Sequence, residues 1–411
     1  MDDLKLIERL GGWEGYSVTT ADRVELDDSK GRRSQFWVEL RPIWDRPRQC
    51  GECGQVTAAI HDVTERWVRD LPVFEMETHL LVHRVRVACP QCGPHVEALS
   101  WLDRYSRVTR RVAESVARMC KDVSIKKVAE YFNLHWQTVK DIDKEYLQKA
   151  LGPPDLSGVA LLVMDEFAIQ KGHRYATVVV EATTKRVLWV GRGRKREDVR
   201  PFFELLGEAG CRKIQAVAID MNGAYEEEVK LHCPQAELVY DLFHVVAKYG
   251  REVIDRVRVD EANRVRDDKP AREVIKGARW LLLRNQGNIE REEDRVRLSE
   301  LLKANRKLAT VYVLKDDLKM LWDYRHPGYA RAFWKGWYNR AMRSRIEALK
   351  DFARRTKDRI DGILAHCRWP LHTSLLEGMN NKIKVIKRMA YGFRDDDYFF
   401  LKIRAAFPGN P

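Results

Sequence analysis

Two aspartates directly follow apolar runs that predict buried β-strands. Asp165 comes after the run LLVM and Asp220 comes after the run AVAI. A carboxylate at such a point is costly unless a cation compensates it. Carboxylate oxygens are ligands that Mg²⁺ and Mn²⁺ prefer. Two such ions about 4 Å apart can hold both the attacking and the leaving oxygen of a phosphoryl displacement. The pair predicts metal-dependent phosphodiester chemistry, although either aspartate alone could cap a helix or turn the chain.

Glu166 is a competing carboxylate because it is adjacent to Asp165. Neighbouring side chains of a strand point to opposite faces, so only one of the two can face the metal ions. We expect that residue to be Asp165, although a β-bulge would reverse the choice.

A third acid lies in the segment SLLEGMNNKIKVIKRMAYGF, which has the apolar periodicity of a helix. Its apolar stripe consists of Met379, Ile383, Ile386 and Ala390. Another face carries Glu377, Asn381, Lys384 and Arg388. We expect Glu377 to complete the metal site and the other three to contact DNA, with a merely solvated helix face as the alternative. Water or a DNA hydroxyl end would be the nucleophile.

Four of the eight cysteines form two close pairs, Cys50 with Cys53 and Cys89 with Cys92, separated by 35 residues. Each pair spans a tight turn, so all four sulfurs can reach one tetrahedral zinc ion. Four thiolates fill its coordination sphere and leave no position for water, which predicts a structural zinc. Free core cysteines are the alternative.

The segment from 124 to 147 predicts two short amphipathic helices with the length and turn of a helix-turn-helix. Ile125, Val128, Ala129 and Phe132 share a face of the first helix, and Trp136, Val139, Ile142 and Tyr146 share a face of the second. The second helix would then expose Gln137, Thr138, Lys140, Asp141 and Lys144 to a major groove, while Lys126, Lys127 and Lys140 would hold phosphates. Two helices that merely pack together would give a similar stripe.

The order of elements around the aspartates indicates how they could meet. Strand-like runs at 159–170, 175–183 and 186–193 precede a helical segment at 197–208, and further strand-like runs follow at 214–221 and 236–241, with a helix between them. This order matches a ribonuclease-H-like layout, in which the first and fourth strands lie side by side. Asp165 and Asp220 would then be neighbours.

The chain is therefore predicted to be a multidomain α/β protein. We expect a β-rich zinc-ribbon module at 1–98, a helix-turn-helix domain at 99–152, and a ribonuclease-H-like core that begins at 158–243. A helical insertion at 244–365 would interrupt this core, and 366–411 would complete it with a last helix from about 371 to 391.

Composition favours an extended polyanion as partner, and nucleic acid is the first candidate. Lys and Arg number 74 against 61 Asp and Glu, a net charge of +13. We find no run of about 18 apolar residues and no signal peptide, which predicts a cytoplasmic protein without disulfides or membrane contact.

The residues described so far resemble the bacterial ISL3 family of insertion-sequence transposases. The resemblance rests on the cysteine pairs, the helix-turn-helix, and the motifs MDEF, AIDMNGAY, DLFH and LLEGMNNKIKVIKRMAYGFRD. It implies that Asp165, Asp220 and Glu377 form a DDE triad. It also implies that the amino-terminal modules bind terminal inverted repeats, and that the enzyme acts as a homodimer or larger oligomer.

The motif DLFH is similar to the Asp-x-x-His signature of related transposases. His244 would then lie near the scissile phosphate, and a core or helix-capping histidine is the competing view.

Two other functions fit part of the pattern. A sequence-specific regulator derived from a transposase would bind DNA and leave it whole. A ribonuclease-H-like nuclease, such as a junction resolvase, would cut DNA without joining the cut end to a second duplex. The intact set of acids argues against the first, and the two DNA-reading modules argue against the second.

Overall fold

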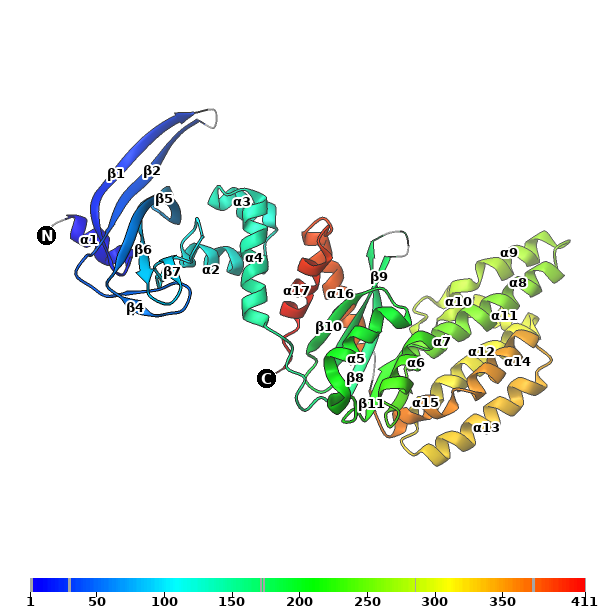
Figure 1. The fold of residues 1–411 in the computed structure, drawn as a ribbon. Coiled ribbons are helices and arrows are strands. Elements are labelled where there is room, and N and C mark those ends of the chain that lie inside the picture. Colours follow the sequence, from blue (N-terminus) through cyan, green and yellow to red (C-terminus); the bar gives the residue numbers. More distant parts are fainter. Residues whose placement is uncertain are drawn as a thin grey trace. The chain divides into compact units, whose positions relative to one another are not determined.

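The computed structural model divides the chain into two compact units, 1–152 with 389–391, and 153–388 with 392–411 (Figure 1). The structure describes residues 3–410 except 29–30, 171, 173, 285 and 372–373. For residues 28, 31, 32, 242, 286 and 374–377 it describes the backbone alone. None of the described helices is long and apolar enough to cross a membrane.

A five-stranded sheet dominates the first unit. Its strands run in the order β1 (Tyr16–Asp28), β2 (Gly31–Pro42), β6 (Met76–Cys89) and β5 (Ile60–Val73), with β7 (Gly93–Val96) paired to β6. Alternate apolar residues such as Val38, Leu40 and Leu80 are buried on one face, where Leu4 and Ile7 of helix α1 (Asp3–Gly11) pack. A separate small hairpin is formed by β3 (Arg48–Gln49) and β4 (Val56–Thr57).

Three helices complete the first unit: α2 (Arg110–Met119), α3 (Ile125–Phe132) and α4 (Trp136–Leu151). Ser124 caps α3, and Asn133 ends it in a left-handed conformation with φ of 46°. The predicted helix pair is therefore present, and Val128, Phe132 and Val139 form its core. Two positions of the predicted apolar stripe are wrong, because Trp136 and Tyr146 are exposed.

The second unit contains a mixed sheet in the order β10 (Val187–Arg192), β9 (Arg174–Glu181), β8 (Leu161–Gln170), β11 (Ala216–Ile219) and β12 (Glu237–Tyr240). The pairs β10–β9 and β9–β8 are antiparallel, whereas β11 runs parallel to both β8 and β12. The predicted adjacency of the first and fourth strands is confirmed.

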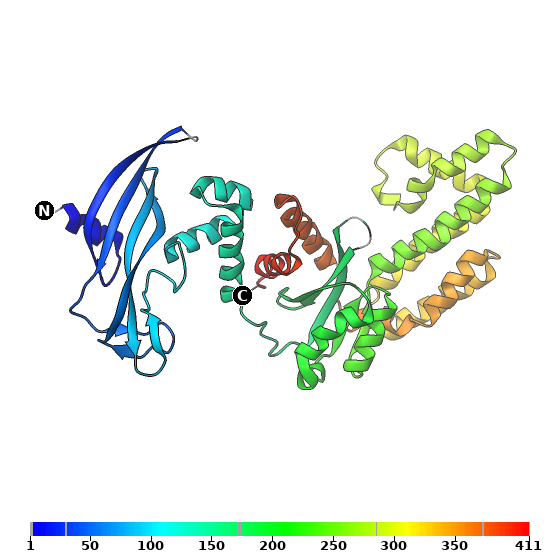
Figure 2. The same ribbon diagram turned by 45° about the horizontal axis from the view of Figure 1, so that its top comes forward.

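Helices cover both faces of this sheet (Figure 2). Leu162 and Met164 of β8 pack with residues of α5 (Arg196–Cys211) and α6 (Gly223–His232). Val163 and Phe167, which point the other way, pack with α16 (Ser374–Met389) and α17 (Asp396–Ala406). The sequence analysis missed α17 and extended the preceding helix to 391. Consecutive aromatic residues at 398–400 obscure the helical period of α17, and Gly392 interrupts the chain with φ of 98°.

The segment after β12 is helical throughout its described residues, as its composition predicts. Its α-helices are α7 (Leu242–Tyr249), α8 (Asp255–Arg264), α9 (Lys269–Gly277), α10 (Arg279–Leu283), α11 (Glu292–Ala304), α12 (Arg306–Lys319), α13 (Pro327–Arg343), α14 (Glu347–Lys357) and α15 (Ile360–Leu364). One further turn (Gly250–Ile254) joins α7 to α8. Tyr249, Trp337 and Phe352 meet edge to face in its core.

Candidate functional site

Strand register brings the two aspartates together. Ala216, Val217 and Ala218 of β11 pair with Leu161, Leu162 and Val163 of β8 in parallel. Continuing this register by two residues places Asp220 beside Asp165. Paired strands lie about 4.8 Å apart, so side chains at neighbouring positions on one face can share a ligand.

Asp165 belongs to the sheet face that α16 covers, and the alternation along β11 indicates the same face for Asp220, which directly follows the strand. Val163 and Phe167 on β8, and Ala216 and Ala218 on β11, pack in the core on this face. Asp165 and Asp220 continue these two alternations. The pairing of β8 with β9 is regular through Asp165 and Glu166, so no bulge reverses their directions. Glu166 therefore points to the opposite face, toward α5 and α6.

Asp165 is half-buried and held by two hydrogen bonds. Its Oδ1 accepts from the backbone N–H of Glu166 at 2.8 Å, and its Oδ2 accepts from Nδ2 of Asn380 on α16 at 2.9 Å. Burial raises the pKa of Asp165 to about 6, although the Glu166 N–H, His244 and Asn380 each lower it. The carboxylate thus lies where its negative charge is poorly solvated.

Asp220 and His244 contact each other. Oδ1 of Asp220 accepts from the N–H of Met221 at 2.5 Å, while its Oδ2 lies 3.4 Å from Nδ1 of His244. His244 is in the first turn of α7, and it is Asp241 that caps this helix by accepting from the N–H of Phe243. Half-buried His244 therefore does not cap α7 and faces the aspartates.

The third predicted acid, Glu377, lies outside the described side chains. Its backbone belongs to α16, one turn before Asn380. Among the described side chains, Asp165, Asp220 and His244 do not form a group of three possible ligands within 4.8 Å of one another. The convergence of the three acids stays a prediction.

Further along α16, Met379 and Ile383 are buried and Ile386 packs against the same core, as the apolar stripe predicts. The predicted DNA contacts Asn381, Lys384 and Arg388 are exposed. Nζ of Lys384 donates to Oδ1 of Asn381 at 3.4 Å. This side of the helix is therefore accessible to a ligand.

Three polar residues around the aspartates, Asn380, Arg194 and Asn222, were not identified from the sequence. Asn380 was overlooked because it lies beside the apolar stripe, and a polar amide next to that stripe is the signal that could have identified it. On the other face, Glu166 accepts from Nη1 of Arg194 at 2.8 Å and from Nδ2 of Asn222 at 3.5 Å. Asn222 also caps α6, since its Oδ1 accepts from the N–H of Ala224. An Asn-Gly pair after an apolar run is the sequence signal for such a cap.

A cleft of about 650 Å³ opens beside these residues. Its lining includes Glu166, Arg194, Asp220 and Asn222. The cleft carries both acidic and basic groups, so it can accept a phosphate and a cation together.

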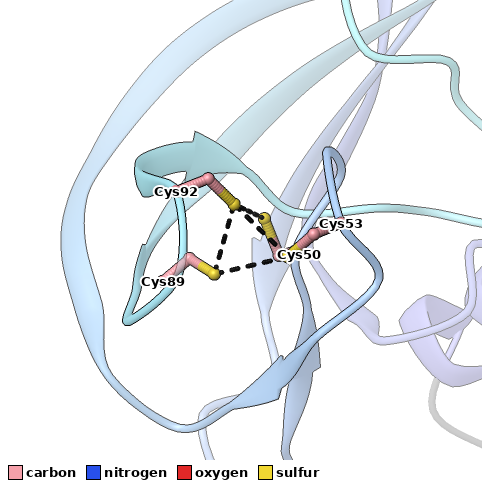
Figure 3. A group of neighbouring side chains, drawn as sticks. All are labelled: Cys50, Cys53, Cys89 and Cys92. Carbon is pink, nitrogen blue, oxygen red and sulfur yellow. Dashed lines mark hydrogen bonds between the residues drawn. The ribbon is translucent and has the colours of Figure 1, made fainter.

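The four predicted cysteines form a cluster (Figure 3). Cys50 and Cys53 lie in the turn between β3 and β4, and Cys89 and Cys92 lie at the turn between β6 and β7. Backbone bonds from Gly51 N–H to Val96 and from Ala98 N–H to Gln49 hold the two turns together.

The sulfur geometry fits one tetrahedral metal ion. Sulfur pairs lie 3.3 to 3.6 Å apart, close to the separation of about 3.8 Å that zinc–sulfur bonds of about 2.3 Å imply. Backbone N–H groups of Cys53 and Glu52 lower the pKa of the Cys50 thiol, which favours the thiolate that binds metal. The cluster suggests a structural zinc.

The predicted contacts of the helix-turn-helix are only partly exposed. Thr138, Asp141, Lys126 and Lys127 are exposed, and Nζ of Lys127 pairs with Glu130 at 2.9 Å. Gln137, Lys140 and Lys144 of α4 are half-buried. Nε2 of Gln137 donates to Asp141 at 2.7 Å. Their contact with DNA stays a prediction.

Comparisons with known proteins match all three parts of the chain. A family model described as a transposase matches residues 162–403. A model for the helix-turn-helix domain of transposase family ISL3 matches 97–147, and one for the zinc finger of transposases of IS204, IS1001, IS1096 and IS1165 matches 46–92.

Two curated proteins are similar over nearly their whole length. The chain is 54% identical over 411 residues to the transposase for insertion sequence element IS1001 of Bordetella parapertussis, covering 100% of both chains. It is 28% identical over 422 residues to the transposase for insertion sequence element IS1557 of Mycobacterium tuberculosis (strain H37Rv), covering 96% of this chain and 93% of that protein.

Proposed function

The chain belongs to the ISL3 family of transposases, and we propose that it binds the terminal inverted repeats of its insertion sequence and catalyses metal-dependent cleavage and strand transfer. The observation that carries this proposal is the parallel pairing of β8 with β11, because Asp165 lies on β8 and Asp220 directly follows β11. Two carboxylates at neighbouring positions suit divalent-ion catalysis of phosphodiester displacement.

We further propose that the catalytic core is ribonuclease-H-like. The support is the strand order, with three antiparallel strands followed by two parallel ones, and the helices on both sheet faces. The long helical segment between β12 and α16 would then be an insertion before the helix that carries the third acid.

The residues around Asp165 fit a hard divalent cation. Oδ1 of Asn380 is buried and accepts no hydrogen bond from any described residue, while burial raises the pKa of the adjacent Asp165. Both features indicate a place for positive charge, and carboxylate and amide oxygens are ligands that Mg²⁺ and Mn²⁺ accept. Asp165, Asp220 and Glu377 would hold two such ions, which supply Lewis-acid stabilisation of the phosphodiester.

The chain's own groups have separate roles in this mechanism. Asn380 orients Asp165 through its amide, and His244 orients Asp220 and lies where it can contact the scissile phosphate. Water and then a DNA hydroxyl end act as nucleophiles, so no side chain forms a covalent intermediate.

The amino-terminal unit would recognise the ends of the element. The thiolate cluster, with one zinc, holds the ribbon, and the helix-turn-helix presents Lys126, Lys127, Gln137, Thr138, Lys140 and Lys144 to DNA. Asn381, Lys384 and Arg388 of α16 would contact DNA near the carboxylates. We propose that a homodimer or larger oligomer pairs the two ends in the cytoplasm.

The test is cleavage and joining of a labelled duplex that contains an element end, with Mg²⁺ or Mn²⁺. The wild-type chain should cut at the end and join it to a second duplex. Asp220→Asn should bind the duplex equally well and produce neither product. Wild-type protein that binds the end and leaves every duplex whole would contradict the proposal and favour a regulator. Cutting without joining would favour a nuclease.

A further inference from the structure

We propose that the exposed face of α13 binds the phosphate backbone of duplex DNA. The inference rests on the proposed transposase function and adds a DNA-binding surface outside both the amino-terminal modules and α16. Figure 1 shows α13 at the edge of the helical segment of the second unit.

The charge of α13 is of one sign. Its 17 residues, PGYARAFWKGWYNRAMR, include the four cations Arg331, Lys335, Arg340 and Arg343 and no acid. A solvated helix usually carries both signs, as α11 does with four acidic and three basic residues in EEDRVRLSELLKA. Complementarity to a polyanion explains the exclusion of acids from α13.

The cations line the side of α13 that faces solvent. Ala330, Trp334, Trp337 and Ala341 are buried in the helical core. Arg331, Lys335, Asn339 and Arg343 are exposed and recur every four residues. At 1.5 Å per residue this row is about 18 Å long, the axial rise of about five base pairs. Three charges and an amide can thus follow one stretch of DNA backbone.

These cations are available to a ligand. Arg331 and Arg340 form exposed ion pairs, with Asp361 at 2.5 Å and Asp317 at 2.6 Å. Exposed pairs of this kind exchange readily with other anions because they contribute little stability. Lys335 and Arg343 form no ion pair with any residue that the structure describes.

Small residues between the cations leave the surface flat. Gly328, Ala332 and Gly336 are exposed on the same side. A Cβ atom added at Gly336 would meet nothing within 4 Å, so packing inside the chain does not require a glycine there. Glycine within a helix disfavours folding, and close approach by a DNA backbone is a reason to retain it.

The residue after the helix supports the same conclusion. Arg345 follows the C-cap residue Ser344 and has φ of 62°, a left-handed conformation that favours glycine or asparagine. The chain instead places an exposed arginine there. A cation thus stands at a position where the backbone favours another residue, two residues after the last cation of α13.

Removing two charges tests the surface directly. The double variant Lys335→Gln with Arg343→Gln keeps long side chains and helix propensity. Its matched control, Arg297→Gln with Lys303→Gln, removes two exposed charges from α11 in the same unit. Affinity for a duplex carrying an element end, measured by fluorescence anisotropy over a range of salt concentrations, should fall about tenfold for the α13 variant. Its slope of log affinity against log salt should decrease by about 2. In the α11 control variant, neither the affinity nor the salt slope should change by more than about twofold.

Arg345→Gly gives a second variant, which should fold as the wild type does. Glycine fits the left-handed backbone, so its Tm should be equal to or above that of the wild type. Its salt slope should nevertheless decrease by about 1.

Equal effects of the α13 and α11 double variants, or a wild-type affinity and salt slope in both the α13 double variant and Arg345→Gly, would overturn the inference. Binding and cleavage of the element end by the wild-type protein, measured in parallel, test the proposed function separately. If the wild-type protein cuts and joins DNA while the variants bind DNA as tightly as it does, the inference is refuted and the proposed function is not.

Discussion

The thiolate cluster of the first unit and the carboxylate site of the second differ in how they are assembled. Two hairpin turns place four sulfurs within 4.8 Å of one another. The predicted carboxylates belong to two strands and a helix that span more than 200 residues of sequence, so only tertiary packing could unite them. Four thiolates would saturate one zinc ion and support the fold. Three carboxylates would leave room at their ions for a substrate, as catalysis requires.

Both sites depend on backbone N–H groups, with different consequences. At Cys50 they lower the pKa of the thiol and favour the thiolate form. At Asp165 an N–H also lowers the pKa, but burial outweighs it and the pKa rises to about 6. A raised pKa of this kind is common among the acids of functional sites.

The largest effect is expected from breaking the thiolate cluster. Cys89→Ser should lose zinc and lower the unfolding temperature of the first unit by roughly 10 °C, because metal binding is coupled to folding. Zinc content by atomic emission and calorimetry measure both. Cys120→Ser, at a buried cysteine outside the cluster, is the control and should keep its zinc. Retention of zinc by the Cys89 variant would contradict the assignment.

A smaller effect is expected at Asn380. Asn380→Ala removes the side chain that donates to Asp165, and hydrogen bonds to charged groups are worth about 2 kcal/mol, so cleavage should slow at least about tenfold. The neighbouring exposed Asn381→Ala should leave the cleavage rate of bound DNA unchanged. Single-turnover cleavage at saturating DNA measures both. An equal decrease of the cleavage rate in both variants would contradict the positioning role of Asn380.

Substitution of Glu166 tests which face of β8 carries the catalytic acid. Glu166→Gln weakens the interactions with Arg194 and Asn222 and should lower the free energy of unfolding by about 1 kcal/mol. Cleavage should slow only a few-fold, in contrast to Asp165→Asn, which should abolish it. Urea unfolding and cleavage assays provide the comparison. Loss of all cleavage in the Glu166→Gln variant would indicate that Glu166 is an essential acid and would contradict the assignment to Asp165 alone.

The smallest effect is expected on α13. Gly336→Ala should raise the free energy of unfolding by about 0.5 to 1 kcal/mol, since alanine fits the helix and nothing lies within 4 Å of the added carbon. Urea unfolding of the second unit measures this change. A decrease would show that Gly336 is needed for packing rather than for access to its surface.

Local patterns predicted much of this architecture. Turn-flanked cysteine pairs, the period of α3 and the apolar runs of β8 and β11 each depend on residues close in sequence. The role of Asn380 and the exposure of Trp136 depend on which elements pack together, which periodicity does not encode. Helix α17 was missed for a similar reason. Its consecutive residues Phe399 and Phe400 both pack in the core against the sheet, so the apolar residues of α17 do not show a clear helical period. The position of the Glu377 side chain stays a prediction.

Binding of Mn²⁺ tests most directly whether the three acids form one site. Electron paramagnetic resonance titration of the zinc-loaded chain should show that Asp165→Asn, Asp220→Asn and Glu377→Gln each weaken Mn²⁺ binding about tenfold or more, while Glu166→Gln binds Mn²⁺ as the wild type does. Wild-type Mn²⁺ affinity in all three acid variants would contradict the account.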